Sequence, residues 1–193
     1  AILAETHKDK QMLLFSATID YRIKSMVKNY MDEPDIIEVG SEEVPEIDEE
    51  TVYLTRKQKM GKLIEILMEN KGVRTIVFCS TKRSVEYVCD RLNNNGVNAR
   101  FLHGGKTQSQ RERTVKDFKR GYFDTLIATD VASRGLHIEG VDLIINYDMA
   151  ESDDTHRHRI GRTGRMGKKG RAITFEESDP YVPRHMRGGD YRR

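Results

Sequence analysis

Short apolar runs alternate with segments of helical periodicity along most of this 193-residue chain, and this alternation strongly constrains its fold. Arg74 to Ser80 reads RTIVFCS, a β-branched apolar run typical of a strand buried on both faces. In Thr81 to Asn95 the apolar residues recur at helical spacing, which predicts a helix. Strands alternating with helices predict an α/β fold, with a mainly parallel sheet and helices on both faces.

The same pattern continues on both sides of this unit. We expect further strands at 97–102, 124–128, 141–147 and 171–175, and further helices at 57–70 and 107–120. No apolar run approaches the roughly 20 residues of a spanning helix, so no membrane contact is predicted. Cys79 and Cys89 form neither a disulfide framework nor a Cys-x-x-Cys motif. We expect buried thiols in an intracellular protein, of either nucleus or cytoplasm.

Composition changes at both ends of the alternating region. Residues 41–50 carry six acids and one proline, which predicts a solvated acidic linker. Residues 1–40 offer one helix (20–31) and two strands (12–15 and 35–39), too little for a core, and are interpreted as the end of a preceding domain. The main domain is placed at 51–178. Residues 179–193 are basic, which predicts a disordered tail that binds phosphate backbones or a merely solvated end.

The stretch from His158 to Arg165 (HRIGRTGR) has an arginine at every third position, with glycines between them. On a helix Arg159 and Arg162 would be neighbours, and Gly164 would end the helix so that Arg165 projects. Guanidinium groups stay charged and match phosphate oxygens with paired hydrogen bonds. The stretch predicts contact with the γ-phosphate of a nucleotide, and the alternative is a solvated basic helix end.

Small and hydroxyl residues follow three of the predicted strands, at Ser80-Thr81, Gly104-Gly105 and Thr129-Asp130. Ligands of open α/β sheets bind beyond the carboxyl ends of strands. Thr107 followed by Gln110 fits a capping box, and Arg113 lies one turn further on. The first amides of that helix would form an anion site. These donors predict contacts along a nucleic-acid backbone, and the alternative is ordinary turn and cap chemistry.

Two other patterns in the sequence predict no site. Gly105-Lys106-Thr107 is similar to the end of a Walker A loop, but Arg100 stands where that motif needs its first glycine. His156 and His158 are two residues apart and therefore on different faces of a helix. We expect neither a phosphate loop nor a metal site from these residues.

Together, these stretches resemble the carboxy-terminal half of the DEAD-box ATP-dependent RNA helicases of superfamily 2, from motif III onward. The matching stretches occur in the family's order: Ser16 to Thr18 (motif III), Val77 to Thr81 (motif IV), Gln110 to Arg113, Ala128 to Gly135 (motif V) and His158 to Arg165 (motif VI). The resemblance implies a RecA-like domain, preceded by a fragment of a first RecA-like domain. ATP and Mg²⁺ would bind mainly to that first domain.

The resemblance also implies roles for individual residues. Catalytic contacts with the γ-phosphate would come from Arg162 and Arg165, and nucleotide binding would also involve Gly135 and His137. Contacts with the RNA backbone would come from Thr81, Gly104, Gly105, Gln110, Arg113, Thr129 and Asp130. Coupling between the domains would involve Ser16, Thr18, Arg134, His158 and Arg159.

The implied activity is ATP-dependent unwinding or remodelling of RNA or of RNA–protein complexes. This half would close on ATP, supply an arginine finger and form half of the RNA groove, and the isolated chain is expected to lack ATPase activity. His137 stands where the family usually has Asp, which predicts altered nucleotide binding, and His156 stands where Tyr is usual. These two departures leave open a non-hydrolysing RNA clamp or scaffold. The choice of RNA over DNA rests on the resemblance.

Overall fold

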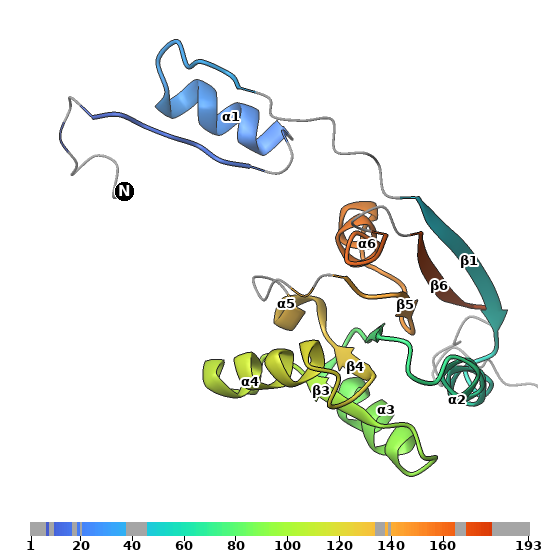
Figure 1. Cartoon of the computed structure of the whole chain (residues 1–193). Coiled ribbons are helices and arrows are strands. Elements are labelled where there is room, and N and C mark those ends of the chain that lie inside the picture. The colour runs from blue at the N-terminus through green and yellow to red at the C-terminus, as the bar shows by residue number, and fades with distance from the viewer. Residues whose placement is uncertain are drawn as a thin grey trace, which may run out of the picture. The chain divides into compact units, whose positions relative to one another are not determined.

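The computed structural model describes residues 7, 10–16, 19, 21–37, 46–133, 138, 140–164 and 169–178 (Figure 1). The chain forms two compact units, Ala1–Ser41 and Glu42–Arg193. The basic segment at 179–193 lies outside the described residues, so its predicted disorder stays a prediction.

The second unit holds a six-stranded sheet in the order β1-β6-β5-β2-β4-β3, and every neighbouring pair is parallel. The strands are β1 (Ile47–Leu54), β2 (Thr75–Phe78), β3 (Ala99–Leu102), β4 (Thr125–Ala128), β5 (Leu143–Asn146) and β6 (Gly170–Glu177). The five strands predicted from apolar runs correspond to β2 through β6. This confirms the predicted parallel α/β fold.

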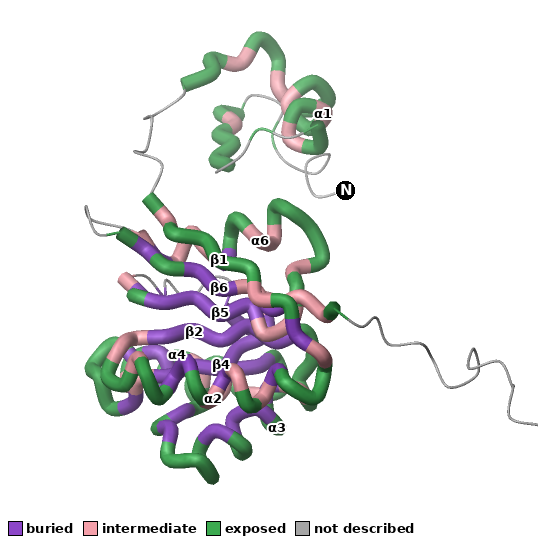
Figure 2. Tube along the Cα trace, turned by 90° about the vertical axis from the view of Figure 1, so that its right-hand side faces the viewer, coloured by how far each residue is buried: buried purple, intermediate pink, exposed green. Residues whose placement is uncertain are grey.

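Helices cover both faces of this sheet. On one face α2 (Lys59–Glu69) and α3 (Lys82–Asn93) contribute to one apolar cluster. On the other face α4 (Gln108–Lys119) and α5 (Asp130–Ser133) contribute to a second cluster, against which α6 (Asp153–Ile160) packs through Ile160. Side chains of β2 alternate between the two clusters, as the pleat of a strand requires. Figure 2 shows the buried residues concentrated along the central strands.

The two cysteines lie in this core as free, buried thiols, as predicted. Burial raises the pKa of the Cys79 thiol well above its usual range. Burial also raises the pKa of Cys89 to about 11. Among the described residues, no helix has both the length and the apolar character needed to cross a membrane.

The prediction of a solvated linker at 41–50 is wrong for its last four residues. They begin β1, which pairs with β6 from Ile47↔Gly170 to Leu54↔Glu177. The acidic side chains stay exposed at the edge of the sheet, where Glu50 pairs with Arg171 (Oε2 to Nη2, 3.1 Å). Charged edge strands of this kind lack the apolar alternation by which strands are recognised. The domain therefore begins by residue 47 instead of 51.

In the first unit the structure describes one helix, α1 (Tyr21–Tyr30), close to the predicted 20–31. The predicted strands are wrong where they can be checked, because residues 12–15 and 35–37 have no regular structure. A strand needs hydrogen-bonding neighbours, and among the described residues neither segment pairs with another strand. No residue of α1 is buried, and Phe15 is 88% exposed. The interpretation of residues 1–40 as part of a preceding domain stays a prediction.

Candidate RNA and nucleotide interface

The loop after β3 is held by a histidine that the sequence analysis missed. His103 is 7% exposed, and its Nδ1 accepts a hydrogen bond of 3.0 Å from the Gly105 N–H. Because Nδ1 is the acceptor, Nε2 carries the proton and donates to Glu86 Oε1 at 2.8 Å. The ring also stacks on Phe101 with 5.2 Å between ring centroids. The imidazole thus fixes the path of Gly104 and Gly105. The only sequence signal for this role of His103 was its position directly before two glycines.

The start of α4 confirms the predicted capping box. Thr107 Oγ1 accepts from the Gln110 N–H at 3.3 Å, and Gln110 Oε1 accepts from the Thr107 N–H at 3.0 Å. Gln110 therefore shows the cap chemistry that was the alternative to RNA contact. Arg113 is exposed one turn further along the same helix.

The start of α3 is capped by Thr81. Its hydroxyl oxygen accepts from the Ser84 N–H at 3.1 Å, and the hydroxyl donates to Ser84 Oγ at 2.9 Å. The preceding amide, Ser80 N–H, donates to Asp148 Oδ2 at 2.9 Å. This hydrogen bond joins motif IV to the segment that follows β5. Its two residues, Ser80 and Asp148, are 68 positions apart in the sequence.

The strand ends carrying these residues lie side by side. β3 and β2 both pair with β4 in parallel, so their carboxyl ends meet at one edge of the sheet. At the end of β4 the Thr129 N–H donates to Leu102 O at 3.3 Å. The structure thus places Thr81, the Gly104-Gly105 loop and Thr129 along the same edge.

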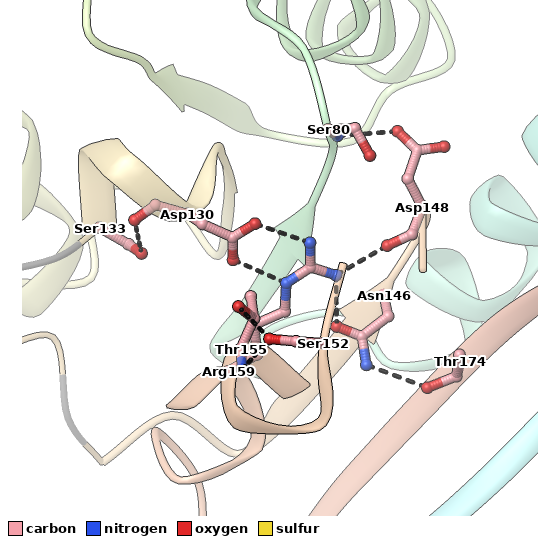
Figure 3. A network of polar contacts seen from close by, with 9 residues as sticks. All are labelled: Ser80, Asp130, Ser133, Asn146, Asp148, Ser152, Thr155, Arg159 and Thr174. Carbon is pink, nitrogen blue, oxygen red and sulfur yellow. Dashed lines mark hydrogen bonds and ion pairs between the residues drawn. The ribbon is translucent and has the colours of Figure 1, made fainter. Parts of the chain in front are cut away.

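Arg159 is the centre of a buried polar network (Figure 3). It is 2% exposed, and its Nε and Nη2 donate to the two carboxylate oxygens of Asp130 at 2.7 and 2.8 Å. Its Nη1 donates to Asn146 Oδ1 at 3.1 Å and to Asp148 O at 2.7 Å. A paired guanidinium and carboxylate satisfy each other's charge inside the domain.

Two predicted site residues meet in this network. The guanidinium of Arg159 donates to groups of its own domain, and both oxygens of Asp130 accept from it, so the pair positions α6. The predicted contact of Asp130 with RNA and the predicted coupling role of Arg159 stay predictions. Sequence reasoning missed Asn146 and Asp148, for which the only signal was a polar residue at the end of an apolar strand.

Arg162 lies outside α6, not on the helix with Arg159 as predicted. The helix ends at Ile160, and a turn follows in which the Arg162 N–H donates to Arg159 O at 3.2 Å. Gly164 adopts a φ of 69°, a conformation that suits glycine, four residues after the helix ends. The glycine therefore closes the turn instead of the helix.

Arg162 and His158 line a shallow hollow beside α5. Its other lining residues are Phe78, Asp130, Ser133, Thr155 and Arg159. His158 is exposed, with its Nδ1 3.6 Å from Asp154 Oδ2. The hollow brings part of motif V and part of motif VI together on one surface.

Some predicted residues are not assessed by this geometry. Thr18, Arg134, Gly135, His137 and Arg165 lie outside the described residues. Ser16 belongs to the first unit and is exposed. Within the described part of the chain, no group of three His, Cys, Asp or Glu side chains is placed to hold a metal ion.

Comparison with known proteins gives one consistent answer. Residues 58–167 match the helicase conserved C-terminal domain family. The chain is 38% identical over 171 residues to the probable ATP-dependent RNA helicase DDX23 of Homo sapiens, covering 88% of this chain and 21% of that protein. It is 39% identical over 177 residues to the DEAD-box ATP-dependent RNA helicase CshA of Geobacillus kaustophilus, covering 91% of this chain and 38% of the relative. The chain thus spans well under half the length of these relatives.

Solved structures share the fold. A DEAD box protein from Methanococcus jannaschii is 36% identical with a TM-score of 0.66, covering 92% of this chain and 48% of that one. Dbp5 of S. cerevisiae bound to RNA and ADP BeF3 is 30% identical with a TM-score of 0.77, covering 92% of this chain and 48% of that one. From the matched family, the parallel sheet and these likenesses, we conclude that the chain belongs to the helicase conserved C-terminal domain family and contains the carboxy-terminal RecA-like domain of a DEAD-box RNA helicase.

Proposed function

We propose that this chain is one half of an ATP-driven RNA-remodelling enzyme, and that it closes with a first RecA-like domain around ATP and one RNA strand. The observation that carries the proposal is the ion pair between Asp130 and Arg159. It joins the strand end that carries Thr129 to the helix that carries His158 and leads to Arg162. In the proposed cycle, a displacement at either place would reach the other through these buried contacts.

The RNA strand would lie along the carboxyl ends of β2, β4 and β3. Thr81, the Gly104-Gly105 loop, Thr129 and the start of α4 at Gln110 border this path, and Arg113 adds an exposed positive charge. Exposed backbone and cationic groups of this kind bind phosphate and sugar groups and do not distinguish bases. We therefore expect binding that depends little on RNA sequence.

The nucleotide would contact Arg162 and Arg165, together with Gly135 and His137. Arg162 lines the hollow beside α5, whose one carboxylate, Asp130, is already paired with Arg159. ATP and Mg²⁺ would be held mainly by the first domain, and a bound Mg²⁺ would neutralise charge on the phosphates. Arginines placed at a transferring phosphate accelerate the reaction by about 10³–10⁵-fold.

Within this half, the residues bind and position, and the chemistry needs the other half. Closure would place Arg162 and Arg165 at the γ-phosphate, while the same movement bends the RNA strand held at the sheet edge. Hydrolysis would then release both ligands. The 193-residue chain alone would bind RNA weakly and hydrolyse no ATP.

The test joins the chain to a first RecA-like domain and measures ATP turnover with and without single-stranded RNA. We expect RNA-stimulated turnover that is lost in Arg165→Ala and in Arg162→Ala. Arg157→Ala is the matched control, because Arg157 is exposed on α6. ATP hydrolysis by the isolated chain would refute the two-domain proposal. ATP-dependent RNA binding without turnover would favour the non-hydrolysing clamp.

A further inference from the structure

A second hollow opens at the carboxyl edge of the sheet, between the first turns of α2 and α3. Its volume is about 400 Å³, and the proposed helicase cycle assigns it no role. It is lined by the turn before α2 and its first residues, by one face of α3, and by the residues that end or follow β5 and β6. The lining residues are Arg56, Lys57, Lys59, Met60, Ser84, Tyr87, Val88, Tyr147, Asp148 and Glu177.

The walls of this hollow combine an exposed aromatic ring with apolar contacts. Tyr87 is 57% exposed on α3, next to the buried Val88. Met60 and Tyr147 are half-buried and complete the apolar part of the lining. An exposed tyrosine beside an apolar wall suits a flat ring that stacks on it.

The charges in the hollow favour an anionic ligand at its mouth. Lys59 is 4% exposed, with its Nζ 3.0 Å from Asp148 Oδ1 and 3.5 Å from Glu177 Oε1. The two carboxylates are thus paired with a buried ammonium group. Arg56 and Lys57 are exposed and give the lining an excess of positive charge.

The hollow continues the edge along which the proposed RNA strand lies. Thr81 caps α3, and Ser84, which contacts Thr81 through two hydrogen bonds, lines the hollow one turn later. The Lys82 side chain reaches the glycine loop, since its Cε would lie 3.9 Å from a Cβ at Gly104. A path of cations and hydroxyls therefore leads from the glycine loop to the hollow.

We propose that this hollow binds one further nucleotide of the RNA strand, with its base stacked on Tyr87 and its phosphate at Lys57 and Arg56. The inference rests on the proposed RNA contact at Thr81. An aromatic ring beside cations also suits an acidic peptide, but continuity with the Thr81 edge favours RNA. The added nucleotide would extend the footprint of this domain beyond the strand ends of β2, β4 and β3.

The test uses the 193-residue chain at low salt with oligouridylates of increasing length. Binding is measured by fluorescence anisotropy of end-labelled RNA, and the contacted residues are identified from NMR chemical-shift changes. We expect Tyr87→Ala to weaken the binding of long oligouridylates by about tenfold, the order expected for one lost base stack. Tyr87→Phe keeps the ring and should bind like the wild type. The matched control is Tyr122→Ala, because Tyr122 is 59% exposed in the turn that precedes β4.

The phosphate contact has a separate readout. Lys57→Gln should reduce the salt dependence of log Kd by about 0.7, the value for one phosphate of a single strand. Lys71→Gln is the control, because Lys71 is exposed in the turn before β2. An unchanged salt dependence in Lys57→Gln would overturn this part of the proposal.

The outcomes separate this inference from the function on which it rests. Shifts at Thr81 and Gly104 without shifts at Tyr87 would overturn the extra nucleotide site and leave RNA binding intact. The absence of shifts at all three positions would overturn both proposals. Shifts at Tyr87 with an acidic peptide, but not with RNA, would show that the hollow binds protein instead.

Discussion

Replacing Arg159 by methionine removes four hydrogen bonds from the centre of the domain. Asp130 loses its partner, and Asn146 Oδ1 and Asp148 O lose theirs. Breaking a buried ion pair costs about 3–5 kcal/mol, because the remaining charge is left uncompensated. The Asp130 side chain is 22% exposed and can regain some water, so we expect the lower end, about 3 kcal/mol.

Urea unfolding of the 193-residue chain, followed by far-UV circular dichroism, measures this loss. Small domains lose about 1–3 kcal/mol per molar urea, so the midpoint should fall by about 1–3 M. Arg157→Met is the control, because its side chain is exposed two residues away on the same helix. The double variant with Asp130→Ala should lose less than the sum of the single variants, since the unpaired carboxylate is gone.

The reasoning would be refuted by a loss below about 1 kcal/mol in Arg159→Met, the size of one ordinary hydrogen bond. An equal loss in Arg157→Met would also refute it, because the effect would then belong to the helix and not to the buried network. Additivity in the double variant would show that the two side chains do not act as a pair.

Three further predictions concern glycines and a thiol. Gly170→Ala should destabilise the domain by about 1–3 kcal/mol in urea unfolding, because a Cβ there lies 2.6 Å from the Gly164 backbone nitrogen; wild-type stability would contradict this packing. Gly61→Ala, in an open position of α2, should stabilise the domain by about 0.5–1 kcal/mol, and a loss would show that the position is crowded. Burial raises the pKa of Cys89 from 9.0 to about 11, so its contribution to stability is complete below pH 9 and falls as the unfolded thiol ionises between pH 9 and about 11. Unfolding measured across that range should show a smaller decline in Cys89→Ala, and an identical decline would exclude this thiol as a cause.

Local patterns in the sequence predicted local structure well. The capping box at Thr107 and Gln110 was found because its partners are three residues apart. The strand at 75–78 was predictable because all four of its residues are apolar or β-branched. In the structure all four are buried. In contrast, β1 carries acids on an exposed edge, so its sequence has the composition of a linker. Its strand conformation depends on β6, more than a hundred residues away.

The candidate site was predictable as a set of motifs but not as a network. The arginine cluster indicated phosphate chemistry, yet Arg159 points inward because partners from α5 and β5 surround it. The spacing of the arginines does not show which of them is buried in the domain and which is exposed. The residues that hydrogen-bond to Arg159 lie 11 to 29 positions away from it in the sequence. The same holds for His103, whose contact with Gly105 is local but whose contact with Glu86 is not.

The pairing of β1 with β6 has a consequence for how the domain is made. These are the first and last strands of the sheet in the chain, and β6 lies between β1 and β5. During synthesis β1 therefore emerges first and finds no neighbour until the last strand has left the ribosome. In a chain truncated after β5, both β6 and the pairing of β1 would be lost, because in the described sheet β1 is hydrogen-bonded to β6 alone. The six-stranded sheet can therefore form completely only after the whole domain has been synthesised.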